Sequence, residues 1–126
     1  MVLSKGDCAV YISIDLKKDR IRIHRATLYK LGNPKLIQLF VSPDCNVAIK
    51  AVDHRVPDGQ EIKVNLDKLP ADASFEVYSS TLIERMRMTK PELLHDGHSY
   101  RLTGKVSIEK RIALFPIASM IRLENE

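Results

Sequence analysis

Residues 20–52 read RIRIHRATLYKLGNPKLIQLFVSPDCNVAIKAV, and this stretch decides the fold. It predicts a short strand, a helix of at most two turns, and two strands joined by a tight turn over 42–46. Gly32 suits the left-handed position that follows a helix, and Pro34 cannot continue the helix. The stretch therefore predicts one strand–helix–strand–strand unit.

A weaker copy of this unit follows in the chain. Segment 21–28 is echoed by 75–82 at an offset of 54, and segment 41–49 is echoed by 106–114 at an offset of 65. The difference, 65 − 54 = 11, predicts an insertion of that length in the second copy, around residues 89–98. We therefore expect an internal repeat.

A further strand precedes each unit. Val10, Ile12, Ile14 and Leu16 alternate with polar residues, which is typical of a strand with one buried face. A polar turn over 17–19 then makes residues 10–24 a hairpin. In the second copy the predicted strands are 61–66, 75–78, 100–106 and 112–117, with a possible bulge at Gly104.

The segment Ser79-Ser80-Thr81 is predicted to cap the helix of the second copy. Thr81 and Glu84 have the spacing of a capping box, and the apolar stripe of this helix consists of Leu82, Ile83 and Met86.

These elements predict a mainly β or α+β fold with two short helices. Two ββαββ repeats, about 9–52 and 60–117, form a pseudo-symmetric barrel or sandwich within a single domain, 1–126. Each repeat alone would expose strand edges, so we expect the two to interlock. The loop 53–60 separates them, and the tail 124–126 is expected to fray.

The composition indicates a soluble globular chain, with 44% apolar and 29% charged residues. Cys8 and Cys45 are too few for a disulfide framework and predict free or buried thiols in a reducing cytoplasm. The first ten residues lack the apolar core of a signal peptide, and the apolar run 112–121 is too short to cross a bilayer. We expect a cytoplasmic protein without a membrane partner.

The net charge of +4 is concentrated at the start of the chain. Residues 1–35 hold eight Lys or Arg and three Asp, a balance of +5. A solvated basic face is one interpretation of this cluster, and a nucleic-acid surface is the other. The predicted nucleic-acid-binding residues are Lys17, Lys18, Arg20, Arg22 and Arg25.

Other polar residues give little sign of catalysis or metal binding. His95 and His98 are three apart in a turn that contains a glycine, but a zinc site would need further ligands from elsewhere. Asp53 and His54 are adjacent, so on an extended segment their side chains point to opposite sides. We therefore expect no catalytic residue, no metal and no cofactor, and a protein that is not an enzyme.

The first repeat resembles AbrB-type transition-state regulators. The resemblance covers about residues 10–52 and rests on Ile14-Asp15, the strand 20–23 and a short helix that ends at Leu31-Gly32. It implies a swapped-hairpin β-barrel that binds DNA through the first hairpin and helix. The family usually has proline where this chain has His24, so the turn into the helix must be built differently.

A second resemblance is weaker. Beginning at Arg20, the order strand, helix and three strands occurs twice, and residues 37–53 are similar to the hairpin of a sliding-clamp domain. Clamp helices are longer than the two turns available here.

Both resemblances imply a role near DNA. We expect a regulator that binds double-stranded DNA through its basic hairpin and helix. The alternative is a protein-interaction or assembly module, such as a ring or scaffold subunit, with an incidental basic hairpin. Both hypotheses, the DNA-binding regulator and the assembly module, are compatible with a homo-oligomer.

Overall fold

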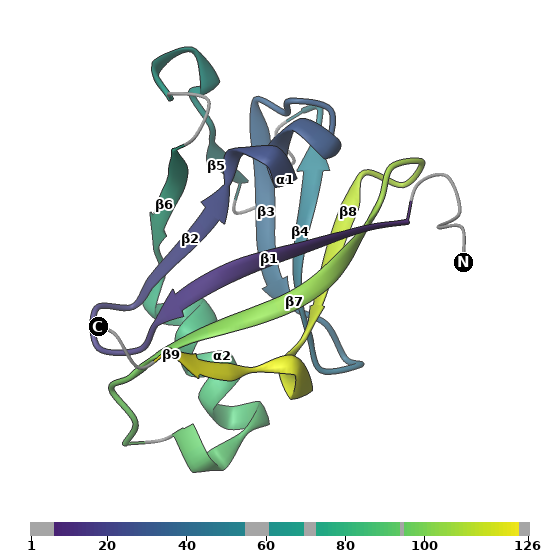
Figure 1. Ribbon diagram of the computed structural model, residues 1–126. Helices are drawn as coiled ribbons and strands as arrows, with labels where there is room; N and C mark the ends of the chain where they lie inside the picture. The colour runs from purple at the N-terminus through teal and green to yellow at the C-terminus, as the bar shows by residue number, and fades with distance from the viewer. Residues whose placement is uncertain (1–6, 55–60, 70–72, 94, 124–126) are drawn as a thin grey trace.

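The computed structural model describes residues 7–54, 61–69, 73–93 and 95–123 (Figure 1). In chain order the strands and helices of this part are β1 Asp7–Asp15, β2 Arg20–His24, α1 Arg25–Lys30, β3 Leu36–Val41, β4 Asn46–Val52, β5 Glu61–Lys63, β6 Ser74–Tyr78, α2 Ser80–Thr89, β7 Ser99–Ser107, β8 Ile112–Pro116 and β9 Ile121–Leu123. Short 3₁₀ turns cover Leu66–Lys68, Pro91–Leu93 and Ile117–Ser119.

The strands form one antiparallel sheet that curls into a half-barrel (Figure 1). Its order is β5-β3-β4-β8-β7-β1-β2-β6, and β9 pairs with one end of β7. The helices α1 and α2 lie at opposite ends of this curled sheet. The predicted fold class, mainly β or α+β with a barrel-like sheet and two short helices, is confirmed.

The two halves of the chain share the sheet. β1 pairs with β7 along nine residues, from Asp7 opposite Ser107 to Asp15 opposite Ser99. β2 pairs with β6, and β4 pairs with β8. The strands of each half therefore complete the pairing of the other half.

The registers of two of these pairs fit the offsets in the sequence. In the β2–β6 pair, Arg22 lies opposite Glu76, which is the residue 54 positions further on. In the β4–β8 pair, Ala48 and Ile49 lie opposite Leu114 and Ala113. The offset of 65 instead relates Ala48 to Ala113 and Ile49 to Leu114. Such an exchange of partners is expected where two similar units pair about a two-fold axis. The repeat itself stays a prediction.

The predicted inward faces form the core. Ile12, Ile14, Ile21 and Ile23 have no solvent exposure, and Leu16 is 2% exposed. The core draws on both halves of the chain, with Leu28, Leu31, Ile37 and Ile49 from the first half and Met86, Leu102, Ala113 and Phe115 from the second.

Side chains cap both helices. His24 is the N-cap of α1, and its ring Nδ1 accepts a hydrogen bond of 3.1 Å from the Ala26 amide. This is how a histidine builds the turn into α1. Ser79 caps α2 by accepting a hydrogen bond from the Leu82 amide at 3.2 Å, as predicted for the segment 79–81. Thr81, where the predicted capping box begins, lies inside the helix. Gly32 follows α1 with φ +88°, as predicted.

Two expectations differ from the structure, and one strand was not expected. The strand predicted over 61–66 pairs only through Glu61–Lys63, and a 3₁₀ turn follows it. The strand β9 was not predicted. Gly104 is not a bulge toward β1, because it pairs in continuous register with Val10. The predictions for residues 55–60 and 124–126 lie outside the described residues.

Gly104 instead permits a close approach of β7 and β8. A Cβ atom added there would collide with the Leu114 carbonyl oxygen and lie 2.7 Å from Cδ2 of Phe115. Both Gly104 and Phe115 are buried, so neither strand can move away without opening the core.

We predict that Gly104→Ala lowers the free energy of unfolding by about 1–3 kcal/mol or more, as overpacking of a closed core does. Gly97→Ala is the matched control, because a Cβ there meets only the Lys17 Cβ at an ordinary 3.8 Å. Urea unfolding midpoints measure both. Equal midpoints for the two variants would contradict this role of Gly104.

Candidate functional site

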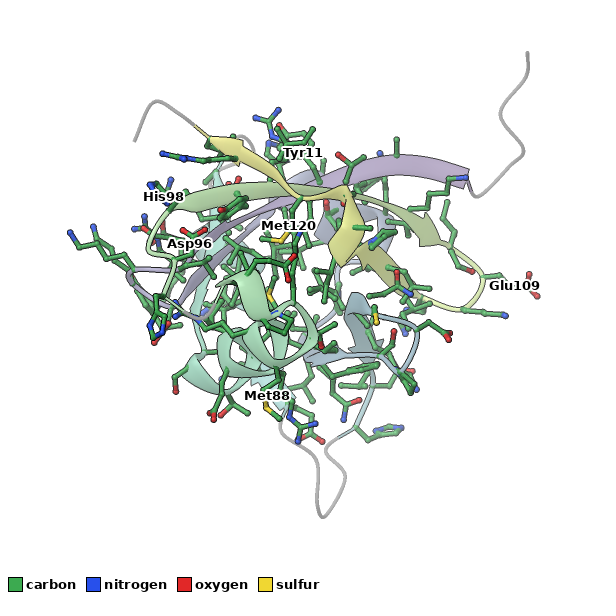
Figure 2. All side chains as sticks on the ribbon, turned by 90° about the horizontal axis from the view of Figure 1, so that it is seen from below. Tyr11, Met88, Asp96, His98, Glu109 and Met120 are labelled. Carbon is green, nitrogen blue, oxygen red and sulfur yellow. The ribbon has the colours of Figure 1, made fainter. Side chains whose placement is uncertain are left out.

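Four of the five predicted binding residues line one hollow on the outer side of the sheet. Lys17, Lys18, Arg20 and Arg22 meet the segment Gly97–Ser99 there, in a hollow of about 580 Å³. We call it the cationic hollow. It lies where the β1–β2 turn meets the beginning of β7, and Figure 2 shows His98 beside Asp96 at this end of β7.

The β1–β2 turn is held by its own backbone. Oδ1 of Asp15 accepts hydrogen bonds from the amides of Lys17 and Lys18 at 3.0 and 3.1 Å. Asp19 completes the turn with φ 51°. Both lysine side chains are exposed, and within the described residues neither forms an ion pair. The turn therefore presents two positive charges from a defined backbone.

The two arginines of β2 are partly neutralised. Arg22 Nε lies 2.7 Å from Glu76 Oε2, and this pair is exposed by 48% and 39%. Arg20 lies 3.3 Å from Asp15 Oδ2 and 3.8 Å from the same Glu76 oxygen. The exposed Arg22–Glu76 pair is worth about 0–1 kcal/mol, so an incoming anion can replace it at small cost. The Arg20–Asp15 pair is different, because both side chains are only 17% exposed.

Arg25 has a different environment. Its guanidinium donates to the carbonyl oxygens of Leu66 and Leu69, at 2.8 and 2.6 Å. These bonds tie the start of α1 to the segment that leads toward β6. The structure therefore places Arg25 away from the hollow, with a contact that supports the fold.

A cation and an aromatic ring that sequence reasoning missed lie on the same outer face. The Arg101 guanidinium is 4.7 Å from the centre of the Tyr11 ring, and the His24 ring is 6.4 Å from that ring. The registers of β1 with β2 and β7 put Arg101 and Arg22 on either side of Ser13. The alternation along β7 turns Arg101 outward, but only the pairing brings it beside β1.

The far side of the hollow is organised by Asp96. Its carboxylate accepts hydrogen bonds from the Tyr100 hydroxyl and from the His98 amide, and it lies 2.7 Å from the His98 ring Nδ1. Arg87 of α2 donates to the carbonyl oxygens of Asp96 and Leu16. The helix thus fixes the two backbone segments that border the hollow.

These contacts change two pKa values. Desolvation acts to raise the pKa of Asp96, but the hydrogen bonds from Tyr100 and His98 outweigh it and the pKa is lowered. The hydrogen bond to Asp96 raises the pKa of Tyr100, and burial adds to this. Asp96 is therefore held as an anion that orients Tyr100 and His98.

The other candidate sites considered from the sequence do not assemble. Asp53 pairs with Arg111 at 2.6 Å, and this hydrogen bond lowers the Asp53 pKa. Among the described residues, no three His, Cys, Asp or Glu side chains are grouped so that they could hold a metal ion. Cys45 is an exposed free thiol, while the Cys8 side chain lies outside what the structure describes. No helix of the described part is long and apolar enough to span a membrane.

No protein-family model matches this chain, and no curated protein or solved structure is significantly similar to it. The interpretation of the hollow therefore depends on its own geometry and charge.

We predict that Arg25→Gln lowers the free energy of unfolding by about 1.5–3 kcal/mol, because a charged donor to two carbonyl oxygens is lost. Arg22→Gln is the control, and it should change stability by about 1 kcal/mol or less, since its ion pair is exposed. Chemical denaturation measures both changes. A neutral Arg25→Gln variant would contradict the anchoring role.

We predict that Asp96 makes stability depend on pH. Its pKa in the folded chain is below the ordinary value of 3.8, so its stabilising contribution is complete above that value and is lost as pH falls through the folded pKa. Wild type should exceed Asp96→Asn in unfolding free energy at pH 7, and the difference should shrink below about pH 4.

Urea unfolding at pH 7, 5 and 3 tests this dependence. Asp44→Asn, in the exposed β3–β4 turn, is the matched control and should follow wild type throughout. A difference between wild type and Asp96→Asn that stays constant over this range would refute the prediction.

Proposed function

We propose that this chain binds double-stranded DNA without catalysis, through the cationic hollow and the adjoining outer face of β1, β2 and β7. The observation that carries the proposal is the convergence of Lys17, Lys18, Arg20 and Arg22 on one hollow. Arg101 extends the positive charge beyond it. Arg25 is left out, because its donors are engaged with carbonyl oxygens.

The charges have the arrangement that phosphate binding requires. Lys17 and Lys18 project from a turn whose backbone is already fixed, so little backbone freedom is lost when they bind. Arg22 gives planar donors that suit phosphate or a guanine edge. Four or five phosphate contacts are within the capacity of this surface.

Glu76 sets the strength of the interaction. Its carboxylate contacts both arginines of β2 and carries the same charge as a phosphate. DNA must therefore displace Glu76 or bind beside it. This predicts modest affinity, which changes when Glu76 is altered.

The proposal also includes the family. An AbrB-type regulator is supported by the element order β1 β2 α1 β3 β4 followed by β5 β6 α2 β7 β8, and by the exchanged registers of β2–β6 and β4–β8. A clamp-like domain is less well supported, since α1 has six residues. A regulator of this kind would act with DNA in the cytoplasm.

The test is fluorescence anisotropy of a labelled mixed-sequence duplex at several salt concentrations. With four or five phosphate contacts, we predict a slope of log K against log salt of about −3.6 to −4.5. The double variant Lys17→Glu/Lys18→Glu should bind more weakly and reduce the slope by about 1.8. Glu76→Gln should bind about fivefold more tightly, the equivalent of about 1 kcal/mol.

The matched control is Lys50→Glu/Lys63→Glu, which makes the same charge change at exposed positions of β4 and β5. It should retain more of the binding than the β1–β2 turn variant. No binding by wild type at low salt, or equal losses in the two double variants, would reject the proposed surface.

A further inference from the structure

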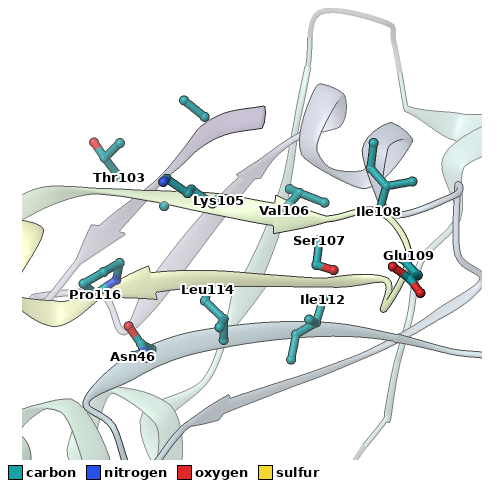
Figure 3. A pocket seen from close by; sticks show the side chains of 12 residues that line it. Asn46, Thr103, Lys105, Val106, Ser107, Ile108, Glu109, Ile112, Leu114 and Pro116 are labelled. Carbon is teal, nitrogen blue, oxygen red and sulfur yellow. The ribbon is translucent and has the colours of Figure 1, made fainter. Parts of the chain in front are cut away.

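A second hollow lies at the other end of β7, and its lining is apolar. It is a groove of about 940 Å³ along the outer side of β7 and β8. Figure 3 shows Thr103 and Lys105 along β7, Leu114 and Ile112 along β8, and Glu109 in the turn between the strands. We call this surface the β7–β8 groove.

The fold itself builds the groove. β7 and β8 pair only from Lys105 opposite Leu114 to Ser107 opposite Ile112. Beyond Gly104 the strands diverge, and the amide of Thr103 donates to the Ser119 hydroxyl instead, at 3.0 Å. The groove is therefore bounded by strands, and the Thr103 amide already has a partner where β7 and β8 diverge.

The apolar surface continues beyond the groove. Ile108 is 48% exposed, and Leu114 and Phe40 are each 38% exposed. The pairings place Ala48 between Phe40 and Leu114, and Ala48 has no solvent exposure. The largest apolar patch of a monomeric protein is typically about 300–600 Å² and is often functional, so this surface is a candidate interface.

The charges along the groove favour a second copy of the chain as its occupant. Lys105 and Glu109 lie two residues before and two residues after Ser107, and within the described chain neither forms an ion pair. If a second copy packs antiparallel about a two-fold axis at Ser107, each Lys105 faces the Glu109 of the other copy. The surface is thus complementary to itself, as a two-fold interface requires.

We propose that the β7–β8 groove is the interface of a homodimer. Five strands at about 4.8 Å spacing and about seven residues of β7 give a footprint on the order of 400 Å² for each copy. The total of about 800 Å² is below the size of a stable specific interface and fits only a weak, transient one. The dimer should therefore be reversible, with a dissociation constant in the micromolar range.

Sedimentation velocity of the full chain from about 1 to 200 μM tests the proposal. Wild type should change reversibly from monomer to dimer over this range, and Leu114→Lys should remain a monomer. A wild type that is monomeric throughout would overturn the proposal.

A charge exchange keeps the test decisive if Leu114→Lys does not fold. Lys105→Glu and Glu109→Lys should each weaken the dimer about three- to tenfold, and the double variant should restore it. Lys110→Glu is the matched control, and it should leave the dimer unchanged. A dimer unaffected by either single exchange, or not restored in the double variant, would place the interface elsewhere.

Discussion

The pairing of β1 with β7 is the constraint on which the rest of the structure depends. These nine residue pairs join the first strand of the chain to β7, from its second half, at the centre of one sheet. Without them, β1, β2 and β6 would be cut off from the other strands as a separate three-stranded sheet, because the sheet order continues from β1 through β2 to β6. The same pairing creates the cationic hollow, because it brings the β1–β2 turn beside the segment that contains His98. Fold and candidate site therefore depend on a contact between distant parts of the sequence.

Local patterns in the sequence were enough to find the helices and strands of the described part except β9, together with their inward faces. Alternation identified β1 and β2, and Ile12 and Ile21 are fully buried as it predicts. The length of β5 was wrong for a physical reason. Val64 continues the alternation and is buried, but the pairing of β5 with β3 ends at Lys63. A buried face therefore does not show how far a strand is paired.

The neighbours of each site residue were beyond such patterns. From the sequence alone, Arg22 is predicted to be a free cation. In the structure, the register of β2 with β6 places Glu76 opposite it. Arg25 belongs to the same basic run, yet its carbonyl partners lie more than 40 residues away. Contacts between distant parts of the chain decide which cations lack a partner. These contacts cannot be predicted from the local patterns of a single sequence. The two halves of the chain also differ in charge at equivalent positions. The first half has the cation Arg22 where the second half has the carboxylate Glu76.

The cationic hollow and the β7–β8 groove lie at opposite ends of the same pair of strands. Asp15 and Ser99 mark one end, and Ala9 and Lys105 lie near the other, about 20 Å away along the strands. A two-fold dimer through the groove would therefore leave both cationic hollows uncovered. One chain makes few phosphate contacts, so it would bind DNA weakly. Two hollows of one dimer that contact the same duplex would bind it more tightly than either hollow alone. Because linkage is reciprocal, DNA that engages both hollows would also strengthen the dimer. Because each interaction is weak alone, DNA binding would then rise more steeply with protein concentration than the binding of a single monomer would.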